Sequence, residues 1–185
     1  MRAFIIHRWG GNPNSDWYPW LKNELEKRKY KVEVSEMPNT SEPKIESWVQ
    51  HLNKVVGKLD SDTLFIAHSI GCQTVMRFLE KSSYNGKLMK VIFVAGWFKL
   101  NNLEDDKVKG IADPWVSKMI DFNKVKDKIS KLTVFLSSND PYGFVEHNAK
   151  VFKEKLGARV MIFKNKGHFS EDDGITTLPE LLREI

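Results

Sequence analysis

Short apolar segments alternate along the chain with longer segments in which apolar residues recur at helical spacing. Most of the short segments carry few polar positions, as strands buried on both faces of a parallel sheet do. One of them, Lys31–Val34, alternates between polar and apolar residues, which is typical of a strand near a sheet edge. The pattern predicts six strands, at residues 4–7, 31–34, 64–67, 88–95, 132–136 and 159–163.

Helical periodicity follows most of these strands. It is strongest from Ile45 to Leu59, where apolar residues lie three or four positions apart and Pro43 precedes the first turn. A strand followed by a helix, repeated along a chain, indicates an α/β fold with one parallel sheet covered on both faces. Residues 96–119 are the least regular segment, and we expect them to form a small cap on a single domain spanning residues 1–185.

The composition is that of an ordinary globular protein, with 41% hydrophobic and 29% charged residues in a chain of 185. The first apolar run, residues 3–6, is too short for a signal peptide or a membrane span. The only cysteine, Cys72, cannot form an internal disulfide, which fits a reducing compartment. These features predict a cytoplasmic protein that does not insert into a membrane.

The net charge of +5 and the pI near 9.2 raise the question of nucleic-acid binding. Most of the 29 basic residues are lysines, however, and acidic residues lie between them along the whole chain. No RNA- or DNA-binding motif accompanies them. We therefore interpret the charge as a solvated, lysine-rich surface and expect no nucleic-acid partner.

Ser69 lies where the third predicted strand meets the following helix. Ala67 and Gly71 stand two positions before and after it. This arrangement is close to the G-x-S-x-G nucleophile elbow, in which a sharp turn raises a serine hydroxyl above a parallel sheet. The serine is then in a strained backbone conformation that requires small neighbours. Ala67 departs from the glycine of the motif but is still small, and we predict that Ser69 is a nucleophile.

A serine nucleophile needs a base and a carboxylate that orients the base. Functional residues of a parallel sheet lie at the carboxyl ends of its strands. Asp140 follows the fifth predicted strand and His168 the sixth, so Ser69, Asp140 and His168 have the chain order of the α/β-hydrolase catalytic triad. We expect His168 to lie within hydrogen-bonding reach of both Ser69 and Asp140.

Other roles are open to several of these polar residues. Asp140 precedes a proline and could cap a helix, and Asp113, which also precedes a proline, is the second candidate for the acid. We expect His68 to pack beside the turn, because its side chain points away from that of the neighbouring serine. Cys72 is expected to be a small buried side chain and not a nucleophile.

Two backbone N–H groups are expected to form an oxyanion hole. One belongs to Ile70, at the N-terminus of the helix that follows the nucleophile. The second is expected from the loop after the first strand, residues 7–11, with Trp9 as the donor, although the loop could also be a plain glycine turn. Aromatic residues near strand ends are predicted to line a small substrate pocket, unless they pack in the core: Trp9, Trp97, Phe98 and Trp115.

Several uncommon strings in the chain resemble those of one known family, the small serine hydrolases related to retinoblastoma-binding protein 9 and bacterial YdeN, within the α/β-hydrolase superfamily. The resemblance covers nearly the whole chain. One departure is Arg8, which stands where related sequences tend to have glycine. The strings are Asp16-Trp17-Tyr18-Pro19-Trp20-Leu21, Met37-Pro38-Asn39 with Trp48, residues 67–71, 94–96 and 138–142, and Gly167-His168-Phe169 with Leu178-Pro179.

The resemblance implies a three-layer α/β-hydrolase fold whose six-stranded sheet has the order 2-1-3-4-5-6. It also implies a carboxylesterase-like serine hydrolase with nucleophile Ser69, acid Asp140 and base His168, which needs no metal or cofactor. Its substrates would be small-molecule esters or amides. Two alternatives remain: a non-catalytic protein-interaction protein on this fold, and a flavodoxin-like nucleotide or flavin binder, although the loop after the first strand matches no phosphate-binding motif.

Overall fold

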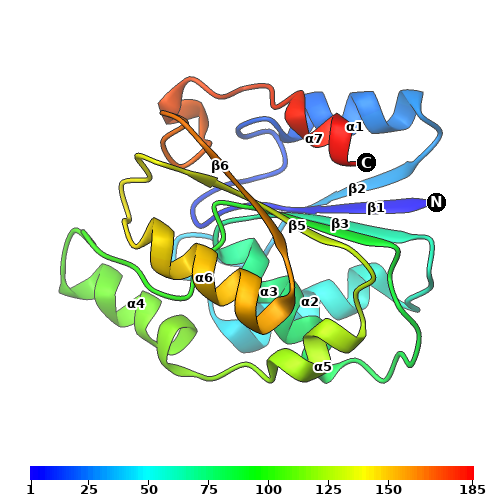
Figure 1. Ribbon diagram of the computed structural model, residues 1–185, viewed down its shortest axis with the longest axis horizontal. Helices are drawn as coiled ribbons and strands as arrows, with labels where there is room; N and C mark the ends of the chain where they lie inside the picture. The colour runs from blue at the N-terminus through cyan, green and yellow to red at the C-terminus, as the bar shows by residue number, and fades with distance from the viewer.

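The computed structural model describes residues 1–185 and contains one six-stranded parallel sheet (Figure 1). The strand order is β2-β1-β3-β4-β5-β6, as expected, and each strand lies within two residues of its predicted bounds. The strands are β1 (Arg2–Ile6), β2 (Lys31–Ser35), β3 (Thr63–His68), β4 (Lys90–Val94), β5 (Leu132–Ser137) and β6 (Arg159–Phe163).

Helices cover both faces of the sheet. Figure 1 shows α1 (Tyr18–Lys27) and α7 (Glu180–Glu184) on one face, and α2 (Ile45–Val56), α3 (Ile70–Lys81), α5 (Phe122–Asp127) and α6 (Val145–Leu156) on the other. Successive strand residues alternate between the two cores, because side chains of a strand point to opposite faces. In β1, Phe4 joins the larger core beside α2 and α3, whereas Ile5 joins the smaller one beside α1 and α7.

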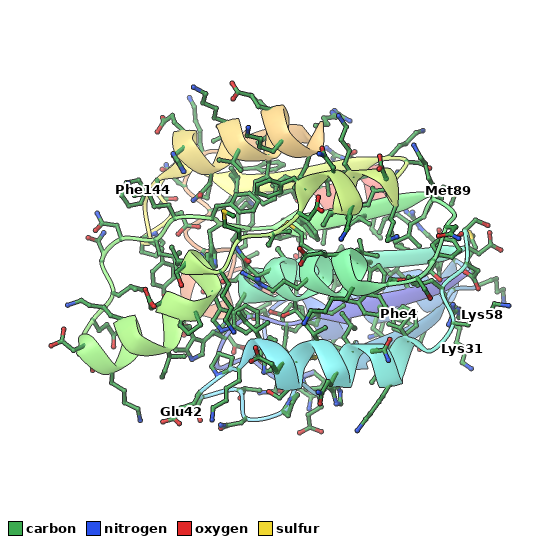
Figure 2. All side chains as sticks on the ribbon, turned by 90° about the horizontal axis from the view of Figure 1, so that it is seen from below. Phe4, Lys31, Glu42, Lys58, Met89 and Phe144 are labelled. Atoms are coloured by element: carbon green, nitrogen blue, oxygen red, sulfur yellow. The ribbon has the colours of Figure 1, made fainter.

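The carboxyl ends of the strands meet at one edge of the sheet, and α4 (Asp106–Ser117) lies at that end of the molecule (Figure 1). Figure 2 shows the larger helical layer, with α3 between α2 and α6. The labelled Glu42 and Phe144 lie at the same end as α4, and Lys31 and Met89 lie at the opposite end. No helix has both the length and the apolar character that crossing a bilayer requires.

The segment 96–119, expected to be the least regular part of the chain, contains the twelve-residue helix α4. Gly110 and Pro114 lie inside this helix, although both residue types have a low helix propensity. The helix is nevertheless capped by Asp105, whose side chain accepts the N–H of Val108 at 2.8 Å. The short 3₁₀ helix η1 (Glu171–Asp173) and helix α5 were not predicted either.

Candidate active site

Ser69 forms the turn between β3 and α3. Its φ of 54° and ψ of −120° are strained for a residue with a side chain. The turn is held by the Ser69 N–H, which donates to the carbonyl oxygen of Val94 at 2.8 Å. A Cβ atom on Gly71 would lie 2.6 Å from the carbonyl oxygen of Ile6, so only glycine allows α3 to approach the end of β1 so closely.

The Ser69 hydroxyl is hydrogen-bonded to an indole. Trp97, in the loop after β4, donates its Nε1–H to Ser69 Oγ at 3.2 Å. The main chain of Trp97 is fixed in turn, because Gln73 Nε2 donates to its carbonyl oxygen at 2.7 Å. Since an indole N–H can only donate, the hydroxyl proton of Ser69 is left available for another acceptor.

Asp140 and His168 are hydrogen-bonded to each other. His168 Nδ1 lies 2.9 Å from Asp140 Oδ2. A carboxylate only accepts, so Nδ1 carries the proton and Nε2 of His168 presents a lone pair. The other oxygen, Asp140 Oδ1, accepts the N–H of Tyr142 at 3.0 Å. Asp140 therefore caps a tight turn and not a helix, because α6 begins only at Val145.

Ser69 and His168 line the same cleft, which has a volume of about 460 Å³, but they are not hydrogen-bonded to each other. Of the two contacts expected for His168, the structure forms the one to Asp140. The contact to Ser69 is not formed, and the Ser69 oxygen accepts a hydrogen bond from Trp97. The structure thus places all three predicted triad residues at the carboxyl ends of β3, β5 and β6.

Apolar side chains from α4 and the segment before it form one wall of this cleft. They are Leu100, Leu103, Val108 and Ile111. Trp9 and Trp97 also line the cleft, as predicted, whereas Phe98 and Trp115 do not. The ring of Phe98 packs on that of Phe152, with centroids 4.6 Å apart, and the fully buried Trp115 donates its indole N–H to the carbonyl oxygen of Pro43 at 3.1 Å. Phe98 and Trp115 therefore pack in the core, which was the alternative left open for them.

Two main-chain N–H groups near Ser69 have no partner within the protein. The Trp9 N–H makes no hydrogen bond, although its indole donates to the carbonyl oxygen of Ser41 at 3.0 Å. Ile70 is the first residue of α3, and the first N–H groups of a helix have no intrahelical acceptor. Neither N–H group of the predicted oxyanion hole is therefore committed to an acceptor within the protein.

The remaining candidates lie outside the cleft. Asp113 is exposed on α4 and does not contact His168. Cys72 is fully buried, its thiol donates to the carbonyl oxygen of Ala67 at 3.2 Å, and burial raises its pKa, so it is not a nucleophile. Burial also lowers the pKa of His7, which joins the ends of β1 and β2 through a hydrogen bond from the N–H of Met37.

Sequence reasoning missed a buried polar network beside the cleft. The Arg8 guanidinium donates to both carboxylate oxygens of Asp16, at 2.9 and 3.2 Å. Burial is the largest influence on the pKa of Asp16 and would raise it. The hydrogen bonds from Arg8 and from the Glu171 N–H, together with nearby positive charge, outweigh burial, and the pKa lies below its usual value. An acidic residue directly before Trp17 and Tyr18 was the available indication, because a carboxylate among buried aromatics needs a partner.

The ring of His68 packs on Trp17 and Tyr18 beside the turn, and its nitrogens also belong to this polar network. Its Nδ1 lies 2.7 Å from the Tyr18 hydroxyl, and its Nε2 lies 2.7 Å from the carbonyl oxygen of His168. Burial, followed by the repulsion from His168, lowers the pKa of His68 to about 3. This histidine is therefore neutral at ordinary pH, so the two hydrogen bonds require one protonated and one unprotonated ring nitrogen.

Comparison with known proteins gives a consistent result. The family model described as serine hydrolase matches residues 3–185. YdeN of Bacillus subtilis (strain 168) is 29% identical over 182 residues, which are 96% of this chain and 90% of YdeN. The crystal structure of the B. subtilis ydeN gene product has a TM-score of 0.89 at 27% identity, covering 100% of this chain and 96% of that one. These matches confirm the predicted resemblance.

More distant structures share the architecture. A carboxylesterase structure from Nitrososphaera gargenis has a TM-score of 0.70 at 15% identity and covers 100% of this chain and 88% of its own. At this level of identity the similarity shows the fold alone. Together with the strand order, it confirms the predicted three-layer α/β-hydrolase fold.

Proposed function

Because the chain belongs to the serine hydrolase family, we propose that Ser69, Asp140 and His168 form a catalytic triad that cleaves small carboxylic esters or amides. One observation carries this proposal. A serine in a strained strand-to-helix turn faces the same cleft as a histidine whose Nδ1–H is hydrogen-bonded to a carboxylate. That bond leaves His168 Nε2 as the free base, which is the tautomer that nucleophile activation requires.

In the proposed first step, the Ser69 hydroxyl turns from Trp97 toward Nε2 of His168. Ser69 Oγ attacks the substrate carbonyl carbon while its proton passes to Nε2, and the Asp140 carboxylate stabilises the imidazolium that forms. The carbonyl oxygen becomes an oxyanion. The unpartnered N–H groups of Ile70 and Trp9 are proposed to donate to it.

The second half of the reaction regenerates the enzyme. The imidazolium of His168 gives its proton to the leaving alcohol or amine as the tetrahedral intermediate collapses to an acyl-Ser69 ester. A water molecule then loses a proton to His168 Nε2 and attacks this ester. The carboxylic acid leaves, and the Ser69 hydroxyl recovers its proton from His168.

The proposed acyl groups are short or of medium length. The cleft has a volume of about 460 Å³, which is in the lower half of the range for ligand pockets. Its apolar wall consists of side chains on or just before the single helix α4. This wall offers apolar contact to an acyl chain, whereas the polar residues on the opposite side, among them Asp172, suit a solvated leaving group.

A fluorophosphonate probe tests the proposal, because it reacts covalently with an activated serine. The expected result is labelling of the wild type at one serine, and complete loss of both labelling and p-nitrophenyl acetate hydrolysis in Ser69→Ala. Ser41→Ala is the matched control, since Ser41 lines the same cleft. Labelling that persists in Ser69→Ala would refute the assignment. A wild type that is neither labelled nor active would favour the non-catalytic alternative.

A further inference from the structure

The residues just before and at the start of α1 contact the loop that carries His168. Asp16 Oδ1 accepts the main-chain N–H of Glu171 at 2.8 Å. The next residue, Trp17, donates its indole N–H to the carbonyl oxygen of Phe169 at 3.1 Å. Both side chains are fully buried or nearly so. Asp16 and Trp17 thus bind main-chain groups of the residues that directly follow His168, the proposed base.

The third residue, Tyr18, reaches the same loop through His68, and the chemistry of the groups fixes the direction of each hydrogen bond. The carbonyl oxygen of His168 can only accept, so His68 Nε2 carries the proton. Because His68 is neutral, its Nδ1 is an acceptor, and the Tyr18 hydroxyl donates to it. The Tyr18 oxygen in turn accepts the main-chain N–H of Arg8 at 3.1 Å.

These bonds form one directed chain from Arg8 through Tyr18 and His68 to the carbonyl oxygen of His168. A parallel connection runs through Asp16, which binds the Arg8 guanidinium on one side and the N–H of Glu171 on the other. The backbone of Asp16 has a φ of 55°, a strained value for a residue other than glycine. Both connections join the loop after β1 to the loop after β6.

We propose that Tyr18 and His68, with the Arg8–Asp16 ion pair beside them, position the oxyanion loop relative to the catalytic base. This proposal rests on the proposed function. The peptide N–H that Tyr18 binds is that of Arg8, directly before the N–H of Trp9, while the carbonyl that His68 binds belongs to His168 itself. A displacement of about 1 Å in such a group can cost on the order of 100-fold in rate.

The arrangement also gives Arg8 a function. Its guanidinium pairs with the carboxylate of Asp16, which is 0% exposed. An unpaired buried carboxylate would be strongly unfavourable, so Arg8 and Asp16 require each other. Arg8 therefore takes part in both connections: its main-chain N–H donates to the Tyr18 oxygen, and its guanidinium donates to Asp16.

The protonation of His68 can be measured without any enzymatic activity. In ¹⁵N-histidine-labelled protein, His68 is expected as the Nε2–H tautomer, with Nδ1 as the unprotonated nitrogen, from neutral pH to about pH 5. In Tyr18→Phe the Nδ1 resonance should move downfield, because it loses its donor, while in Tyr30→Phe it should stay in place. Tyr30 is a suitable control because its hydroxyl makes no hydrogen bond within the protein. An Nδ1–H tautomer would overturn the proposal, as would an unchanged Tyr18→Phe spectrum.

Kinetics test whether the network positions the catalytic groups or only stabilises the fold. Tyr18→Phe should lower kcat for p-nitrophenyl acetate by about 10- to 100-fold with KM within about twofold. Tyr30→Phe should leave both constants unchanged. Equal kcat values in Tyr18→Phe and wild type would overturn the proposal. An inactive wild type with the expected tautomer would instead count against the proposed hydrolase.

A pair of His68 variants keeps the test decisive if Tyr18→Phe does not fold. His68→Gln retains an amide N–H that can donate to the carbonyl oxygen of His168, whereas His68→Leu has a similar volume and no donor. We expect kcat to be at least about tenfold higher in His68→Gln than in His68→Leu, with similar KM values. Equal kcat values in the two variants would show that the hydrogen bond to His168 does not matter for the reaction.

Discussion

The two walls of the cleft are held in place by different kinds of contact. The triad wall consists of the loop after β1 (residues 7–17) and the loop after β6 (residues 164–173). It is fixed by buried, directional hydrogen bonds around Asp16, Tyr18 and His68. The α4 wall, residues 97–118, presents mainly apolar side chains to the cleft and is attached to the rest of the molecule chiefly at its two ends.

The attachment of the α4 wall is visible in its hydrogen bonds. At its beginning, the Asn148 side chain accepts the N–H groups of Phe98 and Lys99 at 2.9 and 3.0 Å. At its end, one nitrogen of the buried Arg77 donates to the carbonyl oxygens of Trp115 and Lys118 at 3.0 and 2.7 Å. The last carbonyls of α4 have no intrahelical partner, so Arg77 both satisfies them and complements the helix dipole.

The difference matches the role that the proposed function gives to each wall. Hydrogen bonds have preferred distances and angles, so the triad wall can hold reacting groups in one geometry. Apolar contact is not directional, so the α4 wall can accept acyl groups of several shapes. The comparison predicts that changes in the triad wall alter kcat or stability, and that changes in the lining of the α4 wall alter substrate preference.

The largest effect, on kcat, is expected from substitutions in the proposed triad. His168→Ala should lower kcat on the order of 10⁴-fold, and Asp140→Asn should lower it less but still strongly. In the proposed mechanism the three residues act as one unit, so adding Asp140→Asn to His168→Ala should change kcat little further. Asp113→Asn, on the exposed side of α4, is the control and should be fully active. Losses that multiply in the double variant would mean that Asp140 does not act through His168.

The next effect is a pH dependence of stability caused by His68. Its pKa is about 3 in the folded protein, against an ordinary value of 6.5 for a solvated histidine, so the unfolded chain binds a proton that the folded chain does not. Stability should therefore fall as the pH is lowered from 6.5 toward 3, with a slope contribution of up to about 1.4 kcal/mol per pH unit.

Urea denaturation between pH 4 and 7 measures this slope. The steep decline should be reduced in His68→Gln, which cannot titrate, and should persist in His51→Gln, whose ring makes its hydrogen bond to the Ser35 hydroxyl. His7, whose pKa is also lowered by burial, contributes in the same direction and accounts for part of the remaining slope. Identical slopes in wild type and His68→Gln would contradict a neutral, buried His68.

A smaller effect, on the free energy of unfolding, is expected from substituting Arg77, which binds the end of the α4 wall. Arg77→Met leaves two carbonyl groups without their donor and should lower the free energy of unfolding by about 1–3 kcal/mol. Lys107→Ala is the matched control, because it removes only an ion pair with Glu42 between two exposed side chains. We expect no measurable change in Tm for this control. If Arg77→Met were as stable as wild type in urea, the attachment of α4 would lie elsewhere.

The smallest effect concerns acyl selectivity. For p-nitrophenyl esters of increasing chain length, kcat/KM should be highest at short chains. Ile111→Ala should move this optimum by one or two carbons and change kcat/KM for any one ester by about tenfold or less, since a methylene in an apolar pocket contributes about 1–3 kcal/mol at most. Val116→Ala, on the same helix but outside the cleft, should not move it. An optimum at long, micelle-forming esters would exclude the small pocket.

Local patterns in the sequence were sufficient to predict the sheet and the polar residues at the carboxyl ends of its strands. Strands such as β3 and β5 are recognised because their central residues are apolar or small, in short runs that can be buried on both faces. Once the strands are placed, Asp140 and His168 must lie near Ser69, because parallel strands end at the same edge. The helix α4 was missed because Gly110 and Pro114 obscure its periodicity, while its anchors at Asn148 and Arg77 are far away in the sequence.

Side-chain direction was harder to predict than position. The residues Trp97 and Phe98 are adjacent, yet only Trp97 turns toward Ser69, because neighbouring residues in an extended loop point in different directions. The role of His68 depends on Tyr18, which is fifty positions earlier, and on the carbonyl oxygen of His168, one hundred positions later. Contacts over such separations leave no periodic pattern in the sequence.

The buried thiol of Cys72 makes this chain well suited to spectroscopic distance measurements. Its sulfur is enclosed by the core and its pKa is raised, so thiol-directed spin labels would not react with it in the folded protein. Cysteines introduced at Met119, which is 92% exposed beside the end of α4, and at Asp172 on the triad wall would be labelled selectively. Electron paramagnetic resonance would then report the separation of the two walls, with and without a bound inhibitor, in a protein that keeps its native cysteine.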